Sequence, residues 1–256
     1  HQVKAEIGKA VFGQERVVEL ALAAVLAGGH ALLIGAPGLA KTRLVEAMGT
    51  ALGLSNQRIQ FTPDLMPSDI IGSEVLDESA GGQRSFRFLK GEQEGTYPLP
   101  EAQLDRFLLK IDVAYPDLDT ERRILIETTG GADQTVRPAL DAEQLMSIQA
   151  LVRRMPVGEK IVAAILNLIR EARPEQTSDA RVQRLVDWGP SPRAGQALML
   201  AARSRALLRG RLAPSIEDVE ALAEPALGHR MAMRYDPTGE APSLTDLIND
   251  LARKVA

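Results

Sequence analysis

The sequence has no cysteine, which excludes disulfides and thiolate metal sites and is typical of a reducing compartment. Its three histidines, His1, His30 and His229, lie far apart and lack the spacing of a metal site. There is no apolar run of the ~20 residues that a membrane helix needs, and no visible secretory leader. The chain starts at His1 rather than Met, so a removed leader stays open. We expect a cytoplasmic protein without a membrane span.

Neither sign of charge dominates, because the formal net charge is only -4. The bulk electrostatics therefore do not favour nucleic acid or an anionic membrane as a partner. Four arginines do gather within residues 203–211, but no aromatic residues alternate with them to stack bases. We expect these arginines to form a solvated face or a subunit contact. With 45% apolar residues, a chain of 256 residues allows one or two globular domains.

The most informative motif is GAPGLAKT, residues 35–42. It matches a phosphate-binding loop except that Ala40 stands where the second glycine is usual. The apolar block 31–34 precedes it and is typical of a strand buried on both faces. Apolar residues at helical spacing follow it as far as Leu52. Strand, glycine-rich turn and helix form the context that such a loop requires.

In this context the backbone N–H groups of the turn and of the helix start point at the β-phosphate, assisted by the helix dipole. Lys41 reaches the β- and γ-phosphates, and the Thr42 hydroxyl ligates Mg²⁺. Ala40 keeps the N–H that a phosphate needs. If the position requires a left-handed backbone, Ala costs ~1 kcal/mol there; if it belongs to the first helical turn, Ala is the better residue. The alternative is a tight strand-to-helix turn with a surface lysine.

The rest of the chain divides into two parts. Up to residue 114 it alternates helix and strand: a helix at 14–27, strands at 58–62 and 106–116, and a hairpin of strands 73–79 and 84–90. From residue 115 to 256 the patterns are helical, with N-caps at Asp141, Ser215 and Ser243. The predicted helices are 120–128, 141–154, 158–172, 192–209, 215–226 and 243–255, with an irregular connection at 173–192.

Taken together, the chain resembles the MoxR family of AAA+ ATPases over almost its whole length. The stretches that carry the resemblance are GAPGLAKT, TPDLMPSDIIGSEV, EGTYPLPEAQLDRF and SPRAGQALMLAARSRALLRGR. Alanine at position 40 is itself usual in that family. The resemblance implies an α/β fold: a P-loop AAA+ core, αβα with a mostly parallel sheet, at 1–114, and an all-helical lid at 115–256. It also implies a homo-oligomeric ring, usually a hexamer, with ATP between subunits.

The resemblance also assigns a nucleotide site for ATP or ADP. Val11, Phe12 and Gly13 would border the adenine, and Ile124 would close its other side, although plain lid core is the favoured interpretation of Ile124. The loop residues assigned to the nucleotide are Gly35, Pro37, Gly38, Leu39, Ala40, Lys41, Thr42 and Arg43, with Thr42 as the Mg²⁺ ligand.

Two arginines complete the catalytic set with Lys41. Arg106 matches the arginine finger, which enters the neighbouring subunit's site, and Arg193 matches the sensor-2 arginine, which binds the γ-phosphate. Both placements make physical sense, because phosphoryl transfer develops charge on oxygens that guanidinium groups stabilise. Each arginine also has an ordinary interpretation as a surface salt-bridge partner.

The acidic residues of such a site are missing. The family has an apolar strand ending in Asp-Glu, and then a strand with a polar sensor-1 residue, between the parts that match FLKG at 88–91 and EGTYPLP at 94–100. Here Glu92 follows Gly91 directly, so several dozen residues are absent. Asp77-Glu78 follows too short an apolar stretch to replace the pair, and Asp112 comes too late in the chain.

Two explanations are open: the printed sequence omits a segment between 91 and 92, or the protein lacks it. We favour the first, because loss of two central strands would expose core faces and unpaired strand edges. The resemblance then implies a ring that couples Mg-ATP hydrolysis to chaperone-like remodelling or maturation of a client protein, often one with a von Willebrand factor A domain. The alternatives are a nucleotide-gated binding protein that holds ATP without hydrolysis, and a DNA-remodelling AAA+ relative, which the net charge disfavours.

Overall fold

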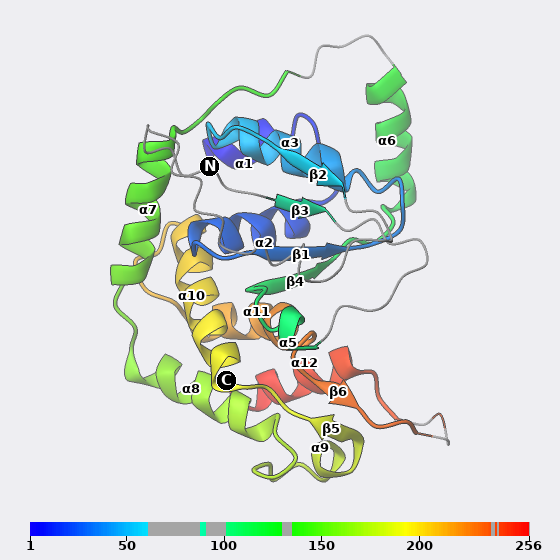
Figure 1. Cartoon of the computed structure of the whole chain (residues 1–256), viewed down its shortest axis with the longest axis vertical. Coiled ribbons are helices and arrows are strands. Elements are labelled where there is room, and N and C mark those ends of the chain that lie inside the picture. Colours follow the sequence, from blue (N-terminus) through cyan, green and yellow to red (C-terminus); the bar gives the residue numbers. More distant parts are fainter. Residues whose placement is uncertain (61–87, 91–100, 130–134, 237–238, 240, 256) are drawn as a thin grey trace.

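The computed structural model describes residues 1–60, 88–90, 101–129, 135–236, 239 and 241–255 (Figure 1). The first part of the chain alternates short helices with strands, as the sequence predicts. Its elements are α1 (Gln2–Ile7), α2 (Glu15–Leu26), β1 (Ala31–Ile34), α3 (Lys41–Ala51), β2 (Arg58–Gln60), β3 (Phe88–Lys90), α5 (Glu101–Leu104) and β4 (Leu109–Asp112).

The strands of this part pair in parallel, in two pairs. Strand β1 lies beside β4 with Ala31 opposite Leu109, and β2 lies beside β3. Among the described strands, none joins the two pairs, and β1 has β4 as its one partner. Ile34, at the end of β1, is consequently 44% exposed. The described part of the sheet is therefore parallel but open at the strand that carries the loop.

One strand prediction differs from the structure. The predicted strand 106–116 is shorter, β4 covering only Leu109–Asp112. The predicted hairpin strand 84–90 is described only at Phe88–Lys90, which pairs in parallel with β2, and the hairpin itself stays a prediction. The other predicted hairpin strand, 73–79, lies outside the described residues.

The second part of the chain is helical, as predicted. Asp141, Ser215 and Ser243 are confirmed as N-caps; the Asp141 carboxylate, for example, accepts a hydrogen bond of 2.8 Å from the Gln144 amide. The elements are α6 (Leu118–Thr129), α7 (Ala142–Arg154), α8 (Glu159–Glu171), α9 (Ala180–Leu185), β5 (Val186–Trp188), α10 (Pro192–Leu208), α11 (Ile216–Leu227), β6 (Ala232–Met233) and α12 (Leu244–Lys254).

The connection predicted at 173–192 is more ordered than turn formers suggest. It contains α9 and then β5, which pairs antiparallel with β6. The sequence did not indicate these strands, because both are very short and the residues that pair lie more than forty positions apart. Strands of two or three residues carry no readable alternation.

A continuous apolar core joins the two parts of the chain. Helix α2 of the first part packs against α10 and α7 of the second (Figure 1), and its Ala23 and Ala24 are fully buried. Small residues on α2 allow this close approach. The division at 114/115 remains a prediction. In the described part of the chain, no helix has the length and apolar character needed to cross a membrane.

Candidate functional site

The backbone of the loop between β1 and α3 has the shape of an anion cradle. Gly38 has a φ of 83°, and Ala40 has a φ of 55° as the N-cap of α3. Gly35 lies so close to β4 that a Cβ there would come 2.6 Å from the Val113 carbonyl oxygen. Turns of this kind, placed before a helix start, direct successive N–H groups into one concavity. The strand–turn–helix context predicted from the sequence is confirmed.

Lys41 begins α3 and folds back over this turn. Its Nζ donates to the Gly35 carbonyl oxygen at 2.8 Å and to the Ala36 carbonyl oxygen at 2.7 Å. The ammonium is thus held beside the turn by two weak, replaceable acceptors. Thr42 follows in the first helical turn, half-buried, with Arg43 exposed beside it. A lysine and a hydroxyl at a helix N-terminus fit a phosphate and its magnesium ion.

The backbone at Ala40 is left-handed, so of the two alternatives for this position the one in which alanine is strained is correct. A non-glycine residue there costs about 1 kcal/mol. We therefore expect Ala40→Gly to raise the free energy of unfolding by about 1 kcal/mol, a rise in Tm of ~2–4 °C for a chain of this size. Thermal denaturation measures it. Ala163→Gly, at an exposed position within α8, is the control and should lower stability by about the same amount. A loss of stability in both variants would contradict the strain at Ala40.

The structure brings the predicted adenine residues against α6. Val11 and Phe12 are buried, at 6% and 9% exposure. Gly13 has a φ of 66°, and a Cβ there would collide with the Thr120 side chain on α6. The Arg123 guanidinium lies 4.7 Å from the centre of the Phe12 ring. Segment 11–13 therefore packs against α6, and Ile124 lies half-buried on that helix.

Gln14 links this segment to the loop. Its Nε2 donates to the Leu39 carbonyl oxygen at 3.2 Å, while its buried Oε1 has no hydrogen-bond partner within the described residues. Leu39 itself is 8% exposed. The contact holds the loop at a fixed distance from segment 11–13. Sequence reasoning missed Gln14, because nothing in a single sequence pairs residues 14 and 39.

The predicted Arg193 contacts a residue that was not predicted, Asp105, which directly precedes the predicted Arg106. Arg193, in the first turn of α10, places its Nη1 3.6 Å from Asp105 Oδ2 and is itself 59% exposed. Ser191, the N-cap of α10, lies 3.5 Å from the same oxygen through its Oγ. Arg106 follows Asp105 directly and is exposed. The carboxylate that contacts the predicted sensor therefore belongs to the residue next to the predicted finger.

The segment around Arg106 is held by Arg230, which lies just after the end of α11. Arg230 is 2% exposed and donates to the Asp105 carboxylate at 2.7 Å and to the Phe107 carbonyl oxygen at 2.6 Å. Burial lowers the pKa of Arg230, and the Asp105 carboxylate opposes this. His229 Nε2 lies 3.0 Å from the same carbonyl of Phe107. Burial, assisted by the charge of Arg230, lowers the pKa of His229 to about 4, so the imidazole is neutral at pH 7.

The arginine cluster at 203–211 differs from the prediction at its centre. Arg205 is 6% exposed, so it is neither solvated nor available to a subunit contact. Its guanidinium lies 3.2 Å from Glu19 on α2 and 2.5 Å from Asp218 on α11. Arg209 also pairs with Glu19, at 3.2 Å. These pairs join the two parts of the chain, and they neutralise charge that a nucleic-acid backbone would otherwise meet.

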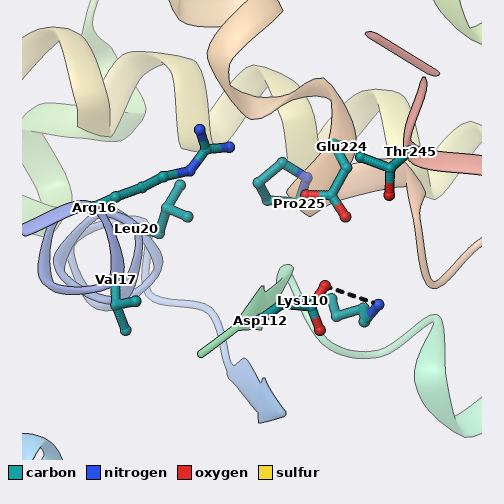
Figure 2. A pocket seen from close by; sticks show the side chains of 8 residues that line it. All are labelled: Arg16, Val17, Leu20, Lys110, Asp112, Glu224, Pro225 and Thr245. Carbon is teal, nitrogen blue, oxygen red and sulfur yellow. Dashed lines mark ion pairs between the residues drawn. The ribbon is translucent and has the colours of Figure 1, made fainter. Parts of the chain in front are cut away.

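A cavity of about 230 Å³ lies between β4 and the helices that cover it (Figure 2). None of the predicted nucleotide residues lines it. Inside it, Lys110 Nζ pairs with Asp112 Oδ2 at 3.0 Å. The lining side chains are Arg16, Val17 and Leu20 from α2, Lys110 and Asp112 from β4, Glu224 and Pro225 from α11, and Thr245 from α12.

Glu224 makes this cavity sensitive to pH. Burial raises the pKa of Glu224 above its ordinary 4.5, and the neighbouring Asp112 adds to the rise. Because the folded state holds this proton more tightly, the contribution of Glu224 to stability is lost as pH rises through the folded pKa. We expect Glu224→Gln to raise the free energy of unfolding at pH 8 by about 1 kcal/mol, which appears as a higher Tm. Below pH 4 the substitution should have no effect. Glu220→Gln, on the same helix, is the control; equal effects of both variants at pH 8 would contradict the assignment.

The described residues hold no group of three metal-ligating side chains. The predicted magnesium ligand Thr42 would therefore need carboxylates from elsewhere in the chain. Asp77 and Glu78 lie outside the described residues, as does the junction of Gly91 with Glu92.

Comparison with known families matches two separate segments of the chain. Residues 30–92 match the family described as "ATPase family associated with various cellular activities (AAA)", and residues 178–251 match the "AAA lid domain". A crystal structure of a protein from Cytophaga hutchinsonii, proposed to be an ATPase, has a TM-score of 0.84 and 28% identity. The likeness covers 99% of this chain and 93% of that one.

Among curated proteins, the chain is similar to chaperone MoxR1 of Mycobacterium tuberculosis, with 33% identity over 98% of this chain and 80% of the relative. It is also similar to the protein MoxR of Methylorubrum extorquens, with 28% identity over 98% of this chain and 91% of that one. The first alignment runs over 304 positions, more than the 256 residues of the chain. The relative therefore has residues to which none in this chain correspond.

Proposed function

Because the chain belongs to the MoxR family of AAA+ ATPases, we propose that it binds Mg-ATP at residues 35–42 and hydrolyses it between the subunits of a ring. The observation that supports this most directly is the turn before α3, where Lys41 lies folded over the carbonyl oxygens of Gly35 and Ala36. A phosphate would draw the ammonium away from these neutral acceptors, because an anion binds it more strongly.

Each predicted residue has a task in this proposal. Lys41 neutralises the β- and γ-phosphates, and Thr42 holds Mg²⁺, which bridges the phosphates and withdraws charge from them. Segment 11–13 and Ile124 on α6 enclose the adenine. Arg193 binds the γ-phosphate of its own subunit's ATP, and Arg106 enters the site of the neighbouring subunit.

We further propose that the ring is a hexamer in the cytoplasm and that it uses ATP turnover to remodel or mature a client protein. A protein with a von Willebrand factor A domain is the client that we would test first. Support comes from the relative named as a chaperone and from Arg106, whose exposure suits a residue that works in another subunit. DNA remodelling is disfavoured, because Arg205 and Arg209 are paired with carboxylates inside the chain.

A second candidate function is a nucleotide-gated binding protein that holds ATP without hydrolysing it. It is favoured by the direct junction of Gly91 with Glu92, where the acidic residues that polarise water are expected. A tryptic digest decides between the two. The peptide GEQEGTYPLPEAQLDR, residues 91–106, exists only if the junction is real. Its absence supports the ATPase.

Lys41→Ala tests the nucleotide site under either function. Hydrogen bonds between charged groups are worth about 1.5–3 kcal/mol, so we expect ATP to bind ~10–150-fold more weakly. Isothermal titration calorimetry with Mg-ATP measures it. Lys160→Ala, an exposed lysine on α8, is the control and should leave the affinity unchanged. Equal affinity in the Lys41 variant would refute the site, and the proposed function with it.

A further inference from the structure

Asp105 lies where three segments of the chain meet. It precedes Arg106 in the segment between α5 and β4, it faces the N-terminus of α10, and it lies against the residues that follow α11. Its side chain is only 27% exposed. A carboxylate between two arginines, Arg193 and Arg230, at such a junction is able to transmit a change at one of them to the segment that it anchors.

One carboxylate oxygen of Asp105 is bound by the buried side chain of Arg230. Arg230 Nε donates to Oδ1 at 2.7 Å, and Arg230 Nη2 donates to the backbone carbonyl of Asp105 at 3.0 Å. The same guanidinium donates to the carbonyls of Phe107 at 2.6 Å, Leu108 at 3.2 Å and Ala226 at 2.6 Å. Because Arg230 is buried and its donors are all engaged, it fixes the backbone on both sides of Arg106 to the end of α11.

The other oxygen is bound loosely. Arg193 Nη1 lies 3.6 Å from Oδ2, and the Arg193 side chain is 59% exposed. The Ser191 hydroxyl is 3.5 Å from the same oxygen. An ion pair of this length and exposure contributes little, about 0–1 kcal/mol. Arg193 is therefore free to move to a stronger anion without disturbing Arg230.

We propose that Asp105 is a positioning residue that links Arg193 to Arg106, so that a γ-phosphate in one subunit's site alters the finger which that subunit offers to its neighbour. The inference rests on the proposed function, which assigns the nucleotide to this site. A γ-phosphate and the Asp105 carboxylate compete for one guanidinium. When Arg193 leaves, Asp105 keeps Arg230 and the weak contact of the Ser191 hydroxyl, and the segment that carries Arg106 loses its ion pair with α10.

Asp105→Asn tests the competition. The amide oxygen still accepts from Arg230, but the negative charge that holds Arg193 is gone. We expect the affinity for the non-hydrolysable ATP analogue AMP-PNP to rise about two- to fivefold, the equivalent of ~0.5–1 kcal/mol, with the affinity for ADP unchanged. In an Arg193→Ala background the substitution should have no effect on either. A rise shared by ADP, or a rise that persists without Arg193, would overturn the link.

A second measurement follows the finger directly and leaves the Arg230 contacts intact. Because the chain has no cysteine, Arg106→Cys accepts a single nitroxide label. At a dilution where light scattering reports monomers, AMP-PNP should change the line shape of the label and ADP should not. The change should vanish in Arg193→Ala. An unchanged line shape with bound AMP-PNP refutes the inference alone, whereas a wild-type chain that binds neither nucleotide refutes the proposed function as well.

Discussion

Arg106→Ala is expected to lower the rate of ATP turnover by about 10³–10⁵-fold, because an arginine finger stabilises the charge that develops on the transferred γ-phosphoryl group. Arg106 is exposed on its own subunit. The loss should therefore appear in kcat and leave the affinity of the same subunit for ATP almost unchanged. Phosphate release by the assembled protein measures turnover, after the tryptic digest has established that the acidic segment is present.

Two controls make this result specific. Arg184→Ala removes an exposed arginine at α9 and should keep full turnover. Mixing Arg106→Ala subunits with Lys41→Ala subunits should restore part of the activity, because the second kind supplies an intact finger to the intact site of the first. A mixture with no activity beyond that of its components would contradict a finger that acts between subunits.

The second large effect is expected at Asp218, whose replacement by asparagine should lower the free energy of unfolding by about 3–5 kcal/mol. Asp218 is fully buried, and its carboxylate accepts from Arg211 at 2.7 Å and from the Ser215 amide at 2.8 Å. Burial alone would raise the pKa of Asp218, but hydrogen bonds from Arg211, Ser215 and Arg205 lower it below 3.8. Without this charge, the buried guanidinium of Arg205 loses its shortest partner.

Glu217 offers a matched control on the same turn of α11. It pairs with Arg205 at 3.2 Å, but its side chain is 66% exposed. Glu217→Gln should therefore cost less than about 1 kcal/mol. Urea denaturation of both variants gives the comparison. Because the folded pKa of Asp218 is lowered, its contribution is present above 3.8 and is lost as pH falls through the folded pKa, so the difference from wild type should shrink in acid. Equal costs for both variants would contradict the role of burial.

The sequence was informative wherever the signal is local. The helix of residues 216–227 was predicted from its apolar period and from Ser215, and Asp218 completes the capping box three residues later. The loop 35–42 was predicted from its neighbours on both sides, and the structure has the strand and the helix in place. Periodicity and caps act over a few residues, so a single chain reveals them.

The parts that were missed depend on contacts between distant residues. Arg230 reaches Asp105 across 125 positions, and neither residue has a local pattern that marks it. The parallel pairing of β3 with β2 was not predicted, because the two strands are separated by residues 61–87 in the sequence. The burial of Arg205 depends on its contacts with Glu19 on α2 and Asp218 on α11. One of these residues comes before Arg205 in the sequence and the other after it. The domain boundary and the nucleotide contacts remain predictions.

Helix α6 differs from the other long helices in how it is attached, because none of its residues is buried. Leu125 and Ile126 are 65% and 62% exposed, so releasing α6 from segment 11–13 uncovers little apolar surface of α6 itself, apart from the Phe12 ring that Arg123 covers. Local opening free energies follow the apolar area that an element hides. The wall on the Ile124 side of the proposed adenine site can therefore open by a sub-global fluctuation, while α2 and α10 stay folded around their shared core.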